Sequence, residues 1–127
     1  MRALVIDDSR ATRAILRRIL QQLDFEVREA ADGREAMGVL EAAGPGGIDL
    51  ALVDWNMPVM DGLEFVKTVR ARSDYDALIL MMVTTEGDTG HMVEALAAGA
   101  NEYAMKPFTA SVIEEKLALL GVSGGDR

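Results

Sequence analysis

Five short apolar segments recur at intervals of about 25 residues along the chain. They lie at residues 3–6, 26–30, 50–53, 78–83 and 102–105. The first, third and fourth are almost continuously apolar, which is typical of strands that are covered on both faces in a parallel sheet. The second alternates between polar and apolar residues, as an edge strand does, and the fifth is also mixed.

Helical patterns occupy the intervals between these segments. They cover residues 9–23, 33–42, 63–71, about 88–98 and about 109–120. Asp32 is expected to cap the second helix, Gly99 to follow the end of the fourth, and either Thr109 or Ser111 to cap the fifth. Five alternating strands and helices predict a single α/β domain, a doubly wound (βα)₅ fold. Its five-stranded parallel sheet should have the flavodoxin-like order 2-1-3-4-5.

Polar residues are expected to gather at one edge of this sheet. In open parallel sheets the ligand site lies at the carboxyl ends of the strands, near the point where the strand order reverses. The residues at those ends are Asp7, Asp8, Asp54, Thr84 and Lys106. Because four different strands contribute, helix capping alone does not explain the pattern.

The chemistry of these residues limits what such a site does. Three neighbouring carboxylates resist ionisation unless a cation joins them. Lys106 supplies one positive charge, and a divalent cation would supply two more. Oxygen ligands without histidine or cysteine suit Mg²⁺ better than zinc or copper. A carboxylate held against Mg²⁺ and a lysine is suited to attack a phosphoryl donor, so the sequence predicts Mg²⁺-dependent phosphoryl chemistry.

Composition excludes several other classes of protein. The formal net charge of −8 argues against nucleic acid as a partner, because phosphate backbones require clustered basic residues. No apolar run is long enough to span a membrane, and the absence of cysteine excludes disulfides and thiolate metal sites. A cytoplasmic location fits these features. The first 23 residues are basic, with five arginines against two aspartates, which fits either a docking face for an acidic partner or a solvated helix face.

Five motifs in order identify a family resemblance. They are VIDDSRATR (5–13), ALVDWNMPVMDGLEFVKTVR (51–70), MMVTTEG (81–87), AAGANEYAMKPFT (97–109) and EEKL (114–117). Together they resemble the receiver domains of two-component response regulators, most closely the chemotaxis-type (CheY-like) single-domain regulators. The resemblance predicts a receiver domain over residues 1–120, and the glycine-rich sequence that follows predicts a flexible tail over residues 121–127.

The resemblance implies a role for each site residue. Asp54 resembles the phosphoacceptor, which takes its phosphoryl group from a histidine kinase or a histidine phosphotransfer protein. Asp8 resembles a direct Mg²⁺ ligand, Asp7 a ligand that acts mainly through water, and Asn56 a ligand through its backbone carbonyl. Lys106 resembles the charge partner of the phosphoryl group.

A conformational switch is also implied. Thr84 resembles the hydroxyl that moves toward the phosphoryl group, and Tyr103 the aromatic residue that then turns inward. The downstream protein should bind the face formed by the fourth helix, fifth strand and fifth helix. The kinase or phosphotransfer partner should dock near the first helix, where we predict contacts from Arg13 and Arg17. Such a protein is expected to be a monomer, and no enzyme: it catalyses only its own phosphorylation and dephosphorylation.

Alternative functions remain open at this point. The output is chemotaxis-type by resemblance, but a phosphorelay intermediate or a stand-alone receiver with a target outside the motor has the same motifs. A distant alternative is a Mg²⁺-dependent aspartyl phosphatase of the haloacid-dehalogenase type, which would need an acid where Asn56 stands. A flavodoxin-like nucleotide binder would need a phosphate loop where DDSRATR stands. Trp55 is expected to be partly exposed and His91 to be a solvated helix residue, both without a role in the chemistry.

Overall fold

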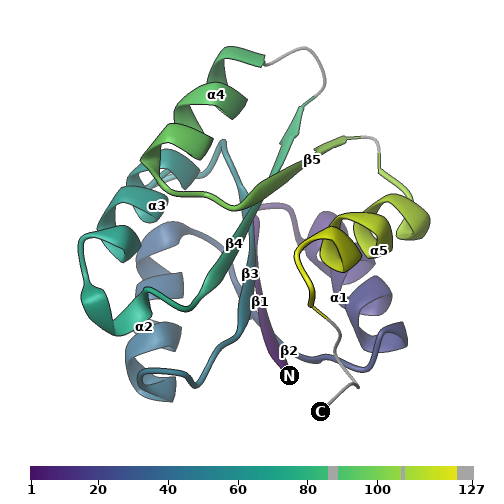
Figure 1. The fold of residues 1–127 in the computed structure, drawn as a ribbon, viewed down its shortest axis with the longest axis horizontal. Coiled ribbons are helices and arrows are strands. Elements are labelled where there is room, and N and C mark those ends of the chain that lie inside the picture. Colours follow the sequence, from purple (N-terminus) through teal and green to yellow (C-terminus); the bar gives the residue numbers. More distant parts are fainter. Residues whose placement is uncertain (86–88, 107, 123–127) are drawn as a thin grey trace.

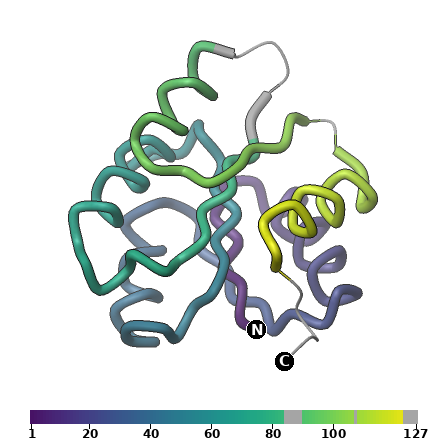
Figure 2. The backbone as a smooth tube through the Cα atoms, viewed as in Figure 1, coloured from purple at the N-terminus to yellow at the C-terminus, as the bar shows by residue number. Residues whose placement is uncertain are grey.

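The computed structural model of the protein describes residues 1–85, 89–106 and 108–122, apart from the side chains of residues 84, 85 and 89. Most of the expected tail therefore lies outside the described residues. Within them, five strands and five α-helices alternate along the chain (Figures 1 and 2). The strands are β1 (Arg2–Ile6), β2 (Glu26–Ala30), β3 (Leu50–Asp54), β4 (Ile79–Thr85) and β5 (Glu102–Lys106). The helices are α1 (Arg10–Gln22), α2 (Gly33–Ala43), α3 (Gly62–Arg70), α4 (Thr89–Ala98) and α5 (Ala110–Leu119), with a short 3₁₀ helix, η1 (Ser73–Tyr75).

All strand pairs are parallel, and the order across the sheet is β2-β1-β3-β4-β5. This confirms the predicted fold and strand order. Helices α2, α3 and α4 cover one face of the sheet, and α1 and α5 cover the other (Figure 1). The strand order reverses between β1 and β3, which places their carboxyl ends side by side at one edge of the sheet.

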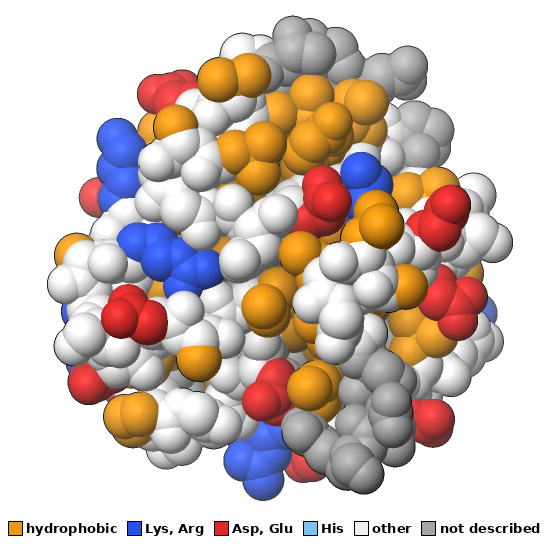
Figure 3. All heavy atoms as spheres, in the orientation of Figure 1, with side chains coloured by type: hydrophobic (Ala, Val, Ile, Leu, Met, Phe, Trp, Pro, Cys, Tyr) orange, Lys and Arg blue, Asp and Glu red, His pale blue; other side chains and the backbone are white. Residues whose placement is uncertain are grey.

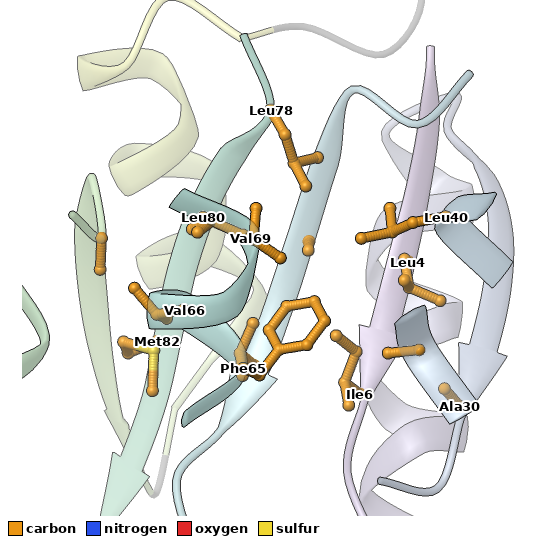
Figure 4. Close-up of a cluster of buried hydrophobic side chains, with 14 of the residues drawn as sticks. Leu4, Ile6, Ala30, Leu40, Phe65, Val66, Val69, Leu78, Leu80 and Met82 are labelled. Carbon is orange, nitrogen blue, oxygen red and sulfur yellow. The ribbon is translucent and has the colours of Figure 1, made fainter. Parts of the chain in front are cut away.

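Alternate residues of each central strand enter different hydrophobic cores. In β3, Ala51 and Val53 belong to the core under α2, α3 and α4, whereas Leu50 and Leu52 belong to the core under α1 and α5. Figure 4 shows the first core, where Phe65 and Val66 of α3 pack over the sheet. Complete burial of one such side chain stabilises the fold by roughly 1.5–3 kcal/mol.

The helices begin where the sequence indicates. Asp32 accepts a hydrogen bond from the Glu35 N–H (2.8 Å), as expected of an N-cap. Thr109, one of two alternatives, caps α5 by accepting from the Val112 N–H at 3.2 Å. Gly99 follows α4 with φ of +122°, a conformation that favours glycine.

A single arginine, Arg70, connects several segments at the amino ends of β4 and β5. These ends lie opposite the carboxyl ends of the strands, where the site is expected. The Arg70 guanidinium, at the end of α3, donates to the carbonyls of Gly99 (2.9 Å), Tyr75 (3.0 Å) and Leu78 (2.8 Å). It also donates to the Asn101 side-chain oxygen at 2.9 Å. Burial among these neutral acceptors lowers the pKa of Arg70. We call this set of contacts the Arg70 clamp; it joins α3, η1 and the segments that lead into β4 and β5.

Candidate functional site

Three carboxylates meet at the carboxyl ends of β1 and β3. Asp7 and Asp8 follow β1, and Asp54 is the last residue of β3. One oxygen from each lies within 4.8 Å of the others. Asp7 and Asp54 are buried and Asp8 is exposed. The strand pairing that aligns Ile6 with Val53 brings them together, as the sequence predicted from their positions. We refer to the three as the acidic cluster.

Lys106 reaches this cluster from the end of β5. Its Nζ lies 3.3 Å from Asp7 Oδ2 and 3.3 Å from Asp54 Oδ1. Because β4 separates β5 from β3, only a long side chain spans the distance. Burial alone would lower the pKa of Lys106, but the carboxylates of Asp54 and Asp7 outweigh it and the pKa is raised. Lys106 is therefore a fixed positive charge at the cluster.

The cluster remains short of positive charge. Burial raises the pKa of Asp54 and the neighbouring Asp7 raises it further, while Lys106 lowers it; the net direction is upward. Three carboxylates against one ammonium leave two negative charges uncompensated within the cluster. A donor set of carboxylate oxygens fits a hard divalent cation, so the acidic cluster could hold a metal ion.

Arg13 of α1 contacts the backbone of Asp7, a member of the acidic cluster. Its Nη1 donates to the backbone carbonyl of Asp7 at 2.6 Å, and its Nε pairs with Glu29 Oε1 at 3.1 Å. The Ser9 N–H fixes the Asp7 carboxylate through a 2.8 Å hydrogen bond to Oδ1. With its side chain only 15% exposed, Arg13 is a positioning residue for Asp7. The sequence indicated only that the region containing α1 is basic, with no signal for this contact.

Gly62 allows α3 to begin directly against the phosphoacceptor candidate. Its N–H donates to the Trp55 carbonyl at 2.8 Å. A Cβ at this position would contact the carbonyl oxygen of Asp54 and lie 2.9 Å from Trp55 Cα. Any larger residue would displace the backbone that carries Asp54. The preceding Asp61 caps α3 by accepting from the Glu64 N–H at 2.9 Å.

The remaining predicted residues are Thr84, Asn56 and Tyr103, and no contact between them and the acidic cluster is seen among the described residues. The backbone of Thr84 pairs with Met105 in the sheet, but its side chain lies outside the described residues. Asn56 is exposed in the segment after β3. Tyr103 is half-buried in β5, and the Lys116 Nζ lies 4.6 Å from its ring centroid. The tyrosine therefore contacts α5 through Lys116 and packs against the core under α2, α3 and α4, on an element of the surface predicted to bind the downstream protein.

Trp55 and His91 differ from expectation. Trp55 is buried, at 7% exposure, and its ring stacks on that of His91 with centroids 4.1 Å apart and planes 7° apart. The reason is strand alternation: Ala51, Val53 and Trp55 all point into the core under α2, α3 and α4. We expected a partly exposed tryptophan and a solvated histidine; the structure shows a packed pair that joins the end of β3 to α4.

The described part of the chain contains no helix that is both long enough and apolar enough to cross a membrane. This agrees with the hydropathy of the sequence.

Comparison with known proteins identifies the family. The response regulator receiver domain family matches residues 3–118. A chemotaxis protein CheY homolog from Campylobacter jejuni is 43% identical, over 99% of this chain and 97% of that protein.

Solved structures agree. CheY4 of Vibrio cholerae is 37% identical, with a TM-score of 0.83 over 95% of this chain and 97% of that one. A putative response regulator from Chloroflexus aurantiacus is 29% identical, with a TM-score of 0.86 over 95% and 98% of the two chains. The chain therefore belongs to the response regulator receiver domain family, as a receiver of CheY type in two-component signalling.

Proposed function

We propose that the protein is a signalling switch that is activated by phosphorylation of Asp54. The observation that carries this proposal is the position of Asp54. Its carboxylate is buried, lies 3.3 Å from the Lys106 ammonium, and shares the acidic cluster with Asp7 and Asp8. In the proposed reaction, an Asp54 oxygen attacks the phosphorus of a phosphohistidine. An O–P bond forms as the N–P bond to the donor imidazole breaks.

The residues at the site are proposed to have different roles in this reaction. Lys106 offsets negative charge on the transferred oxygens and on Asp54. Asp7, Asp8, Asp54 and the backbone carbonyl of Asn56 would hold Mg²⁺. When bound, Mg²⁺ supplies charge neutralisation at the phosphoryl oxygens. Arg13 and Ser9 hold Asp7 in place for that role. The chemistry is confined to the protein's own phosphorylation and dephosphorylation.

The proposed output surface comprises α4, β5 and α5. Hydrophobic side chains gather between α4 and β5 (Figure 3). The exposed apolar residues there are Val93, Leu96 and Met105. Four acidic residues lie on the same elements: Glu94, Glu102, Glu114 and Glu115. We propose that phosphorylation, acting through Thr84 and Tyr103, changes this surface for a partner that offers apolar and basic groups. The relatives named as chemotaxis proteins favour a chemotaxis target, and a phosphorelay or another target remains the alternative.

The test is phosphorylation by a small donor. The purified protein is mixed with acetyl phosphate, with Mg²⁺ or with a chelator, and its intact mass is measured. We expect a mass increase of one phosphoryl group that requires Mg²⁺ and maps to Asp54 by peptide analysis. Mg²⁺ alone should raise the melting temperature, because a ligand at 100 times its Kd stabilises the folded state by about 2.7 kcal/mol. Modification at another residue, or none, would contradict the proposal.

The structure changes which arginines of α1 we expect to contact the kinase. Arg13 is committed to Asp7 and Glu29, and Arg17 also pairs with Glu29 at 2.8 Å. Arg10 and Arg18 are exposed and line a shallow groove with Arg17. We therefore expect charge reversal at Arg10 and Arg18 to weaken docking of the kinase.

The expected result for Arg10→Glu with Arg18→Glu is a fall of about tenfold in phosphotransfer from a histidine kinase, with an unchanged rate from acetyl phosphate. Lys67→Glu, a reversal on the exposed side of α3, is the matched control and should leave both rates unchanged. Equal losses with the kinase and with acetyl phosphate would refute a docking role.

A further inference from the structure

The stacked pair of Trp55 and His91 connects two regions that the proposed function treats separately. Trp55 directly follows Asp54, and its backbone carbonyl is fixed by the Gly62 N–H at 2.8 Å. Its side chain points to the opposite side of the strand from Asp54, into the core that α4 covers. The indole therefore extends from the phosphoacceptor backbone to α4, where the His91 ring lies parallel to it at 4.1 Å.

Few side chains hold α4 to the rest of the protein. Among its described side chains, Met92 and Ala95 are buried, while Val93, Glu94 and Leu96 are exposed. Alanine contributes little contact area, so Met92 and the His91 ring are the large groups that anchor the helix. The His91 ring packs on Trp55, the residue that follows Asp54. One of the large side chains that anchor α4 therefore lies directly against the Trp55 indole.

We propose that His91 is a positioning residue that couples α4 to the state of Asp54 through its stack on Trp55. The inference rests on the proposed function, since it assumes that Asp54 is phosphorylated. Two packed planes transmit a displacement of the Trp55 backbone to α4 because interiors of native density do not absorb it. This link runs through β3 and α4 and is separate from the one proposed through Thr84 in β4 and Tyr103 in β5.

Two substitutions distinguish the effect of the flat His91 ring from the effect of its volume. His91→Phe keeps a flat ring that can stack on the indole, whereas His91→Leu keeps an apolar side chain but no ring plane. The chain has no cysteine, so Val93→Cys places a single thiol on the exposed side of α4 for an environment-sensitive fluorophore. Leu119→Cys, on the exposed side of α5, is the matched control label.

The experiment adds Mg²⁺ and acetyl phosphate to each labelled protein and records fluorescence together with intact mass. At equal phosphorylated fractions, we expect the response at position 93 to fall by about fivefold or more in His91→Leu and to be largely retained in His91→Phe. Trp55→Leu should produce the same loss, and the double variant no further loss, as expected of two residues that act as one unit. The response of the label at position 119 should be equal in all variants.

The outcomes distinguish this inference from the proposed function. If His91→Leu and the unsubstituted protein respond equally at position 93 while both are phosphorylated, the coupling proposal is overturned and Asp54 chemistry stands. If His91→Phe loses as much response as His91→Leu, the ring plane has no role and the proposal is again overturned. If the mass never changes, the proposed function itself fails, and this inference fails with it.

Discussion

The Asp54→Asn variant is expected to accept no phosphoryl group and, in metal-free buffer at neutral pH, to be more stable than the wild-type protein. Loss of phosphorylation follows because the amide has no nucleophilic carboxylate oxygen. The gain in stability follows from the acidic cluster, where three carboxylates face a single lysine. Asparagine has nearly the same shape and removes one of the repelling charges.

The pH dependence of this gain has a definite sign. Burial and Asp7 raise the pKa of Asp54 in the folded protein above its value in the unfolded chain. As pH rises through the interval between the two values, the unfolded chain loses its proton first, so the wild-type protein loses stability with rising pH. Above the folded value the full cost of the buried charge is present. At low pH Asp54 is protonated in both states, and the advantage of asparagine should vanish.

Urea denaturation with EDTA, at neutral and acidic pH, measures this difference. We expect the variant to gain about 1 kcal/mol at neutral pH, which raises the melting temperature by roughly 4 °C. Asp8→Asn is the matched control, and its gain should be smaller because the carboxylate is exposed to solvent. A variant less stable than wild type at neutral pH would show that Lys106 already compensates the cluster.

Arg70→Ala is expected to cause a large loss of stability, about 3 kcal/mol or more. The Arg70 clamp supplies donors to four acceptors in three separate segments. Without the guanidinium, the carbonyls of Tyr75, Leu78 and Gly99 lose a charged donor. Charged hydrogen bonds contribute more than neutral ones, and partly buried acceptors have limited access to replacement water.

Arg70→Lys is the informative companion, since it keeps the charge but lacks the planar fork that reaches several acceptors at once. We expect it to recover less than half of the loss, as measured by the midpoint of urea denaturation. The Mg²⁺ response should persist in both variants while they are folded, because the Arg70 clamp lies at the opposite edge of the sheet from the acidic cluster. Full recovery by lysine would mean that charge alone, and not the fork, stabilises this edge.

The fold was predictable because the signals are local and periodic. The strand predicted at 26–30 has the observed bounds, and the third and fifth were each one residue short at the carboxyl end. Those missed residues are Asp54 and Lys106, polar groups that end the apolar runs and yet belong to the strands. A prediction from hydropathy ends each strand at its last apolar residue, whereas the backbone pairing continues to Asp54 and Lys106.

The site was predictable only in part. Residues at strand ends converge because parallel strands end at one edge, so the acidic cluster and Lys106 follow from topology. The role of Arg13 does not, because its choice of the Asp7 carbonyl depends on how α1 sits against the sheet. The Trp55–His91 stack depends in the same way on the packing of α4, which is distant from Trp55 in sequence. Sequence periodicity shows which face of an element is buried, but it does not show which side chains meet across two layers.

The partition of the interior into two cores has a consequence for how such regulators diversify. Helix α1, which carries the arginines, packs on one side of the sheet, and α4 packs on the other. Under the proposed function, a change in the core beneath α1 that accompanies a new kinase contact needs no compensating change beneath α4. Helix α5, the other helix of the proposed output surface, shares its core with α1. Duplicated genes of this architecture can therefore vary the α4 part of the output surface independently of the α1 face, whereas α1 and α5 are expected to change together.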